Sequence, residues 1–218
     1  MQMAAAPVRD RRRPGARELA RQAMKAQVSE MALDLFLKNG YEQTTIDDIC
    51  AVAGISRSTF FRYFPSKEDV FMSTTSTAPE ELLQALRQRP DDETPWAALR
   101  HAMDPVVAQY AAQSERARRL AELARTTPAL ATRHQEKPAT WQELLAPEIA
   151  RRLGSDPDDE TDPRPRALVA AALACLEAAV VAWIASPGTQ QLAQILHRAM
   201  DSISHDTGRT LETDPGNG

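Results

Sequence analysis

The chain has 218 residues, enough for one large or two small domains, and its eight glycines argue against a loop-rich all-β fold. The net charge of −4 hides an asymmetry, because residues 1–67 hold 11 Lys and Arg against 7 Asp and Glu, whereas residues 68–218 hold 15 against 23. A basic head on an acidic body fits a protein that meets phosphates at one end, although four charges alone do not exclude chance clustering.

Neither a secretion signal nor a membrane span is predicted. The first 15 residues contain no apolar stretch of the signal-peptide kind. The longest apolar run, 168–184, is interrupted by Glu177 and is shorter than the roughly 20 residues that a bilayer requires. Cys50 and Cys175 lie in separate apolar stretches and are interpreted as buried reduced thiols, which favours a cytoplasmic protein.

The chain begins with a flexible basic arm over residues 1–16. We interpret it as a disordered leader or, alternatively, as an arm that reaches DNA phosphate or the minor groove. A helix over 16–38 follows, because apolar residues recur three and four apart between Val28 and Phe36, and Asn39-Gly40 ends it.

Two short helices about a tight turn are predicted next. Thr45 can cap the first of them, and Asp48, three residues on, completes a capping box. Gly54 suits the left-handed residue that ends this helix, and Ser56 can cap a second helix over 57–64. Two short helices about a Gly-containing turn form a helix-turn-helix, whose second helix enters the major groove of DNA.

The rest of the chain is also predicted to be helical. The expected helices are 67–75, 80–89, one or two over 96–124, 128–153, 166–186 and a last one capped by Thr189. Pro105 predicts a kink or break, and Pro138 and Pro147 predict breaks or bends in the long helix that contains them. We therefore expect an all-α fold of about nine helices that ends in a disordered polar tail, 205–218.

The residues around the turn resemble the tetracycline-repressor (TetR) family of bacterial transcription regulators. The family pattern stands here as AGIS at 53–56, TFFRYF at 59–64 and PSKEDV at 65–70. The resemblance is specific over residues 21–71 and extends beyond them as architecture. It implies a helix-turn-helix DNA-binding domain over 17–66 and a ligand-binding and dimerisation domain over 67–204.

The resemblance also implies which residues meet DNA. Arg57 and Ser58 begin the second helix and are expected to contact bases, since Arg can pair bidentately with guanine. The residues expected near the DNA backbone or thymine methyl groups are Thr44, Thr45, Phe61, Arg62, Tyr63 and Lys67. Many relatives have Gly in place of Ser58 and Tyr in place of Phe61, whose ring lacks a hydroxyl for phosphate. Phe60 and Phe64 are spaced by four and are expected in the core.

The last two helices resemble the family's dimer interface, a bundle of four helices contributed by two subunits. A helix that is apolar nearly all round must be covered on two sides, and a fully buried helix of a monomer is the alternative. A dimer would place two recognition helices about 34–36 Å apart on a palindrome. The expected interface residues are Leu168, Ala172, Leu176, Ala179, Trp183, Leu192, Ile195, Leu196 and Ala199.

In the family, the region that corresponds to 79–165 encloses a ligand cavity. The expected lining residues are Trp96, Met103, Val107, Tyr110, Leu123, Trp141, Leu145 and Glu177, with plain core as the alternative for each apolar one. Glu177 could face a ligand, pair with an Arg across the dimer, or reach solvent. Arg-rich 116–119, TPAL at 127–130 and DPRPRALVAAAL at 162–173 resemble actinobacterial regulators that answer to acyl-coenzyme A-like molecules.

Catalysis is not predicted, because the four His have no Cys or carboxylate at metal-ligand spacing, and no phosphate loop or nucleophile elbow occurs. The prediction is a homodimeric repressor, without cofactor, metal or membrane partner. It binds a palindromic operator in double-stranded DNA and is released by a small apolar or amphipathic effector. An activator of the same fold, a helical protein-interaction module and an all-α enzyme remain alternatives.

Overall fold

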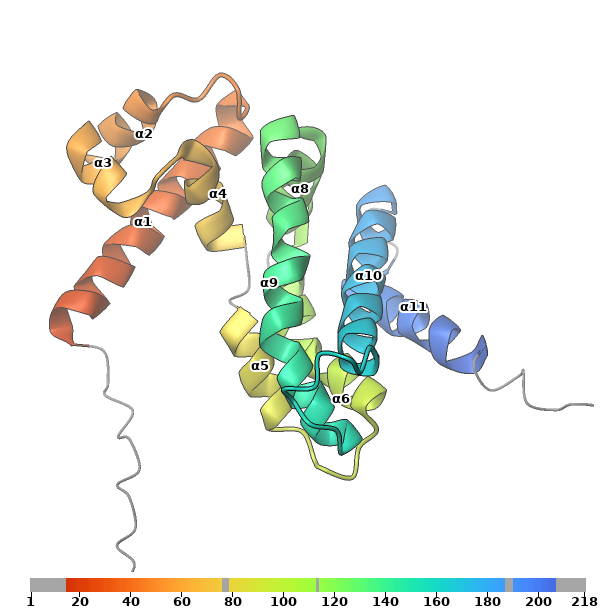
Figure 1. Cartoon of the computed structure of the whole chain (residues 1–218). Helices are drawn as coiled ribbons and strands as arrows, with labels where there is room; N and C mark the ends of the chain where they lie inside the picture. The colour runs from red at the N-terminus through yellow and green to blue at the C-terminus, as the bar shows by residue number, and fades with distance from the viewer. Residues whose placement is uncertain (1–14, 76–78, 113, 187–189, 207–218) are drawn as a thin grey trace, which may run out of the picture. The chain divides into compact units, whose positions relative to one another are not determined.

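The computed structural model describes residues 15–75, 79–112, 114–186 and 190–206 (Figure 1). Every regular element in these ranges is a helix, and eleven helices are present, which confirms the all-α class. The predicted basic arm up to residue 14, the Thr189 cap and the tail from residue 207 lie outside the described residues. Residues 205 and 206, which are predicted to begin the disordered tail, instead belong to the last helix. The chain divides into two compact units, Met1–Thr74 and Thr75–Gly218.

The first unit contains four helices. They are α1 (Ala16–Asn39), α2 (Ile46–Ala53), α3 (Arg57–Tyr63) and α4 (Lys67–Thr75). The helix that the sequence assigns to the start of the second domain, α4, packs here: the Phe71 ring lies 6.2 Å from Phe36, and the hydroxyls of Ser29 and Ser73 are 2.6 Å apart. Phe60 and Phe64 are fully buried, as predicted from their spacing.

The predicted end signals of α2 and α3 are confirmed. The Asp48 backbone N–H donates to the Thr45 hydroxyl at 3.1 Å, and the Thr45 N–H donates to the Asp48 carboxylate at 2.8 Å, closing the capping box. Gly54 is left-handed, with φ 65°, and the Ser56 hydroxyl accepts from the backbone N–H of Thr59. Local hydrogen bonds therefore fix where α2 ends and α3 begins.

The second unit contains seven helices. They are α5 (Pro79–Arg87), α6 (Pro95–Ala102), α7 (Asp104–Ala112), α8 (Ser114–Thr126), α9 (Pro128–Leu153), α10 (Arg164–Ala185) and α11 (Leu192–Asp206). The stretch predicted as one or two helices forms three, α6 to α8, which raises the total above nine. Met103 caps α6 and Pro105 lies in the first turn of α7, where its missing N–H leaves no hydrogen bond unmade.

Of the breaks or bends predicted in the long proline-containing helix, breaks are wrong, because α9 is continuous from Pro128 to Leu153. Each internal proline removes a backbone hydrogen bond and costs about 3 kcal/mol. Leu145 and Ile149, on either side of Pro147, are fully buried, and burying one such side chain stabilises by about 1.5–3 kcal/mol. Tertiary packing offsets the local penalty.

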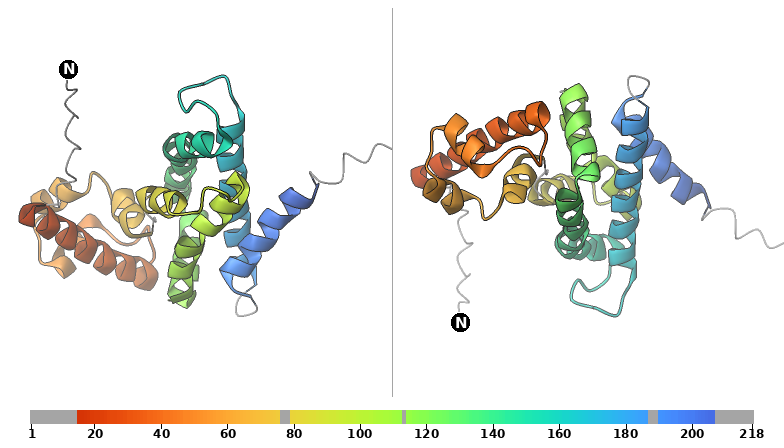
Figure 2. Two further views of the ribbon diagram at one scale, coloured as in Figure 1. Left: turned by 90° about the horizontal axis from the view of Figure 1, so that it is seen from below. Right: turned by 90° about the horizontal axis from the view of Figure 1, so that it is seen from above.

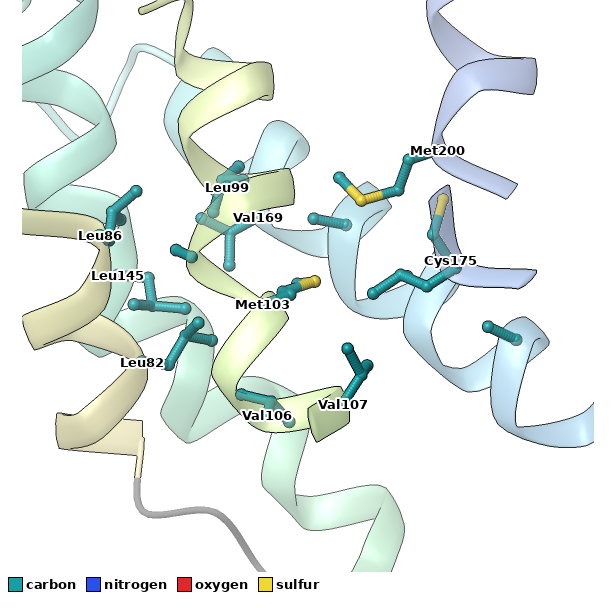
Figure 3. Close-up of a cluster of buried hydrophobic side chains, with 14 of the residues drawn as sticks. Leu82, Leu86, Leu99, Met103, Val106, Val107, Leu145, Val169, Cys175 and Met200 are labelled. Atoms are coloured by element: carbon teal, nitrogen blue, oxygen red, sulfur yellow. The ribbon is translucent and has the colours of Figure 1, made fainter. Parts of the chain in front are cut away.

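One apolar core joins the helices of the second unit. Figure 3 shows Met103 between Leu82 of α5 on one side and Cys175 of α10 with Met200 of α11 on the other. In both views of Figure 2, α10 lies between α9 and α11. Cys50 and Cys175 are both buried and free, as predicted.

The left-handed turn residue gives a test of the helix-turn-helix geometry. A Cβ at Gly54 would meet no atom within 4 Å, but φ +65° disfavours a side chain by about 1–2 kcal/mol. Gly54→Ala should lower the free energy of unfolding by about 1 kcal/mol in urea denaturation. Gly54→Asn is the matched control, since Asn tolerates this conformation and should lose less. Equal losses in both variants would contradict the backbone explanation.

Candidate nucleic-acid interface

One face of α3 is exposed and carries the predicted base contacts. The opposite face holds Phe60, fully buried, with its ring edge-on to the Phe61 ring at 5.4 Å. Phe61 is 46 % exposed, and Arg57, Ser58 and Arg62 also face solvent. The burial of one face therefore decides which side chains α3 can offer to a groove.

Arg57 is held in place by two neighbours. Its Nη1 donates to both carboxylate oxygens of Asp47, at 2.8 and 2.9 Å, and its guanidinium lies 5.8 Å from the centre of the Phe61 ring. Both members of the ion pair are more than half exposed, so the pair contributes at most about 1 kcal/mol. A DNA base can therefore displace Asp47 at small cost.

The other side chains of α3 that are predicted to contact DNA make fewer interactions within the protein. The Ser58 hydroxyl lies 2.9 Å from the Ser56 hydroxyl, and either can be the donor. The Arg62 guanidinium lies 5.2 Å from the centre of the half-buried Tyr63 ring. These side chains keep donors and apolar surface available to DNA.

The two threonines before α2 differ sharply. Thr44 is fully buried, and its hydroxyl donates to the Gly40 carbonyl at 2.8 Å. Thr45 is exposed at the helix N-terminus, where unpaired N–H groups and the helix dipole favour phosphate. Of the two side chains, only that of Thr45 lies where a phosphate can reach it.

Lys67 ties the start of α4 to the loop before α2. Its Nζ donates to the carbonyl oxygens of Tyr41 at 2.9 Å and Thr44 at 3.1 Å, and lies 4.1 Å from the centre of the Tyr41 ring. Two of its three N–H donors therefore serve the protein itself. One donor remains for a phosphate.

Tyr41 and Glu68 extend this link. The Tyr41 hydroxyl donates to Glu68 Oε1 at 2.7 Å, and burial, followed by that hydrogen bond, raises the pKa of Tyr41. Burial alone would raise the pKa of Glu68, but its hydrogen bonds, the one from Tyr41 first, and the charge of Lys67 together lower it. No local pattern joins residues 27 positions apart, so sequence reasoning missed this pair, as it missed Asp47.

In the second unit, the predicted ligand residues do not share one environment. Met103, Val107 and Leu145 lie in the packed core, and Trp141 is also buried. Trp96 is half-buried and donates its indole N–H to the Met200 carbonyl at 3.3 Å. Tyr110 and Leu123 are half-buried. Glu177 binds Arg125 of its own chain at 2.8 Å.

The predicted dimer residues lie mostly inside the subunit. Six of the nine are buried in its own core: Ala172, Ala179, Trp183, Leu192, Ile195 and Leu196. Leu168, Leu176 and Ala199 are partly buried against that core. A side chain that its own subunit already covers has little area left to offer a partner.

Comparison with known proteins identifies the family. The model for bacterial regulatory proteins of the tetR family matches residues 30–73, and the model for the MftR C-terminal domain, within the TetR families, matches residues 93–207. The transcriptional regulator TcmR of Streptomyces glaucescens is 31 % identical over 198 residues, which cover 87 % of each chain. The chain belongs to the TetR family.

Its relatives and structural neighbours agree with this assignment. MftR of Mycobacterium tuberculosis is 32 % identical over 133 residues, 61 % of this chain and 67 % of that one. The repressor FadR of Thermus thermophilus, solved with lauroyl-CoA, shares the fold with a TM-score of 0.60 and 23 % identity, over 89 % of this chain and 99 % of that one. A complex of SmeT with triclosan matches with a TM-score of 0.59 and 20 % identity, over 90 % of this chain and 99 % of that one. The chain is a DNA-binding transcriptional regulator with TetR-type architecture.

The double use of Lys67 can be tested by Lys67→Met, which keeps the length of the side chain but removes its donors. The Tyr41 and Thr44 carbonyls lose a charged donor, so the free energy of unfolding should fall by about 1–3 kcal/mol. If the third N–H meets phosphate, the slope of log affinity for DNA against log salt should shrink by about one per site. The slope can be measured by fluorescence anisotropy with folded variant protein. An unchanged slope would show that Lys67 stabilises the domain and does not contact phosphate.

Proposed function

We propose that this regulator is a homodimeric repressor that holds a palindromic operator and leaves it when a small apolar or amphipathic effector binds its second unit. The observation that carries the DNA contact is the exposed face of α3, on which Arg57 stands opposite the buried Phe60. Lauroyl-CoA and triclosan, bound by FadR and SmeT, support an effector with a large apolar part. Because the relatives are named as transcriptional regulators, we further propose that this protein acts by binding DNA and effector, without catalysing a reaction, and that it does so in the cytoplasm.

We propose that two subunits meet through the outward face of α10. Its exposed apolar residues are Ala167, Ala174, Ala178, Val181, Ala182 and Ala185. Within the described chain, α10 is the one helix long and apolar enough to cross a membrane, and 28 % of its most apolar stretch is buried in the subunit. A second copy would cover the remainder, and alanines let two helices approach closely.

Control by an effector requires two dimer shapes. One shape sets the two α3 helices at the spacing of adjacent major grooves, and the effector binds the other shape more tightly. Linkage then requires DNA to weaken effector binding by the same factor that the effector weakens DNA binding. An effector that binds without changing operator affinity would rule this mechanism out.

The dimer face can be tested with Ala178→Glu. Wild-type protein should sediment at twice the 24.0 kDa chain mass, and the variant should sediment as a monomer, because each subunit would bury an unpaired carboxylate. Ala129→Glu adds the same charge at an exposed position in the first turn of α9 and should stay dimeric. A dimeric Ala178→Glu variant would show that the subunits meet elsewhere.

The base contact can be tested with Arg57→Ala. Operator binding should weaken by about 1–3 kcal/mol, and the preference for operator over scrambled DNA should narrow, because a base contact is lost. Arg87→Ala removes an equal charge from an exposed site in the second unit and should change neither value.

Asp47→Asn is a companion variant, since it frees Arg57 and removes a carboxylate beside the DNA. It should raise affinity for both DNAs by a few-fold, which corresponds to about 1 kcal/mol or less. If Arg57→Ala instead weakens operator and scrambled DNA equally, Arg57 contacts phosphate and the base contact lies elsewhere.

A further inference from the structure

Arg118 of α8 is a half-buried cation of the second unit with an unusual setting. Four side-chain nitrogens of the described residues are buried without a hydrogen-bond partner: Arg100 Nε, His101 Nδ1, Arg118 Nε and Arg152 Nε. Three of these residues lie within 4 Å of a carboxylate: Arg100 by Asp201, His101 by Glu93 and Arg152 by Glu148. Arg118 has no such carboxylate among the described residues.

The partner of Arg118 is an aromatic ring. Its guanidinium lies 4.6 Å from the ring centre of Trp183, a side chain of α10 that is 3 % exposed. Tyr110 of α7 meets the same indole edge-on, with ring centres 5.9 Å apart and planes at 86°. Three helices thus bring a guanidinium, an indole and a phenol together.

The charges around this cluster do not cancel. Glu177 is near enough for its charge to raise the pKa of Tyr110, although burial is the larger cause. That carboxylate is already bound by Arg125 at 2.8 Å. The Arg118 charge is left without a bound counter-charge in the described chain, and stacking on an indole recovers only about 0.5–2 kcal/mol.

A comparison within the same unit shows how this chain treats a structural arginine. The Arg152 side chain is 1 % exposed, and its Nη atoms donate to the carbonyl oxygens of Leu86, Arg89 and Pro90 at 2.7–2.9 Å. No such bond forms for the Arg118 guanidinium or for the Tyr110 hydroxyl within the described residues. Of these donors, the Arg118 Nε is the one that is buried without a hydrogen-bond partner, so it is available to donate to a bound molecule.

We propose that Arg118, Trp183 and Tyr110 form the part of the effector site that receives the anionic group of an otherwise apolar organic molecule. This inference rests on the proposed function, in which the second unit takes the effector. The guanidinium would donate to a carboxylate, sulfonate or phosphate oxygen, Trp183 holds its plane in place, and Tyr110 adds an O–H donor. Val107, one turn before Tyr110, belongs to the apolar core that the rest of the molecule would adjoin.

The position of the cluster connects it to regulation. Trp183 belongs to α10, the helix whose outer face we propose as the dimer interface. An anion held between α8 and α10 would favour one arrangement of these helices, and so one dimer shape. A neutral apolar effector would leave the Arg118 charge uncompensated.

Two dyes provide a matched test with the full-length protein and no DNA. Anilinonaphthalene sulfonate is an anionic apolar probe, and N-phenylnaphthylamine has the same rings without the sulfonate. Wild-type protein should bind the sulfonate dye saturably, at one site per subunit. Arg118→Gln should weaken that binding about tenfold, the loss of one charge-assisted hydrogen bond, and leave the affinity for the neutral dye unchanged.

The controls separate this site from surface charge and from misfolding. Arg119→Gln removes the same charge from the exposed neighbouring position and should leave both dye affinities unchanged. Tyr110→Phe keeps the ring and should weaken binding of the sulfonate dye only a few-fold. Thermal melting checks the fold of each variant. Equal loss of both dyes in Arg118→Gln, or equal loss of sulfonate binding in Arg119→Gln, would overturn the proposal.

The dye result is independent of the proposed repressor function. A sulfonate site that depends on Arg118, in a protein that binds no DNA, would preserve the anion site and refute the repressor. Normal operator binding without an Arg118-dependent dye site would support the repressor and refute the anion site.

Discussion

The burial of Phe60 and Phe64 in the aromatic core of the first unit is the constraint on which the proposed DNA-binding surface depends. Both rings are fully buried, so the face of α3 that carries Arg57, Ser58 and Phe61 must point outward. The Ser56 cap sets the start of α3. The hydrogen bonds from Lys67 to the Tyr41 and Thr44 carbonyls hold the loop before α2. The exposed face that we propose to meet DNA is thus a consequence of packing within the first unit.

The second unit follows the same logic on a larger scale. One side of α10 fills the core beside Met103 and Met200, and the other side is a row of exposed alanines with Val181. A helix divided in this way can serve the fold and an assembly at once. Trp183 lies on the inner side, against Arg118, so an effector there would act on the helix that we propose to join two subunits.

The sequence predicts best those parts of the structure that local signals determine. Thr45 with Asp48, Gly54 and Ser56 each act over a few residues, and the helix-turn-helix they predict is the one found. Long-range packing is what the sequence does not reveal. It keeps α9 continuous through Pro147 and turns Ala172 and Leu196 inward, and it pairs Arg57 with Asp47. Periodicity marks a residue as apolar without saying which neighbour covers it.

The most direct test is a titration of the protein into fluorescent DNA from upstream of its own gene, at two salt concentrations and against scrambled competitor. A sequence-specific dimeric regulator should bind saturably, with two subunits or a multiple of two per site, and its binding should be weakened by salt and resistant to the competitor. Salt-insensitive binding, one subunit per site, or equal loss to scrambled DNA across a selection of genomic fragments would contradict a sequence-specific dimeric regulator.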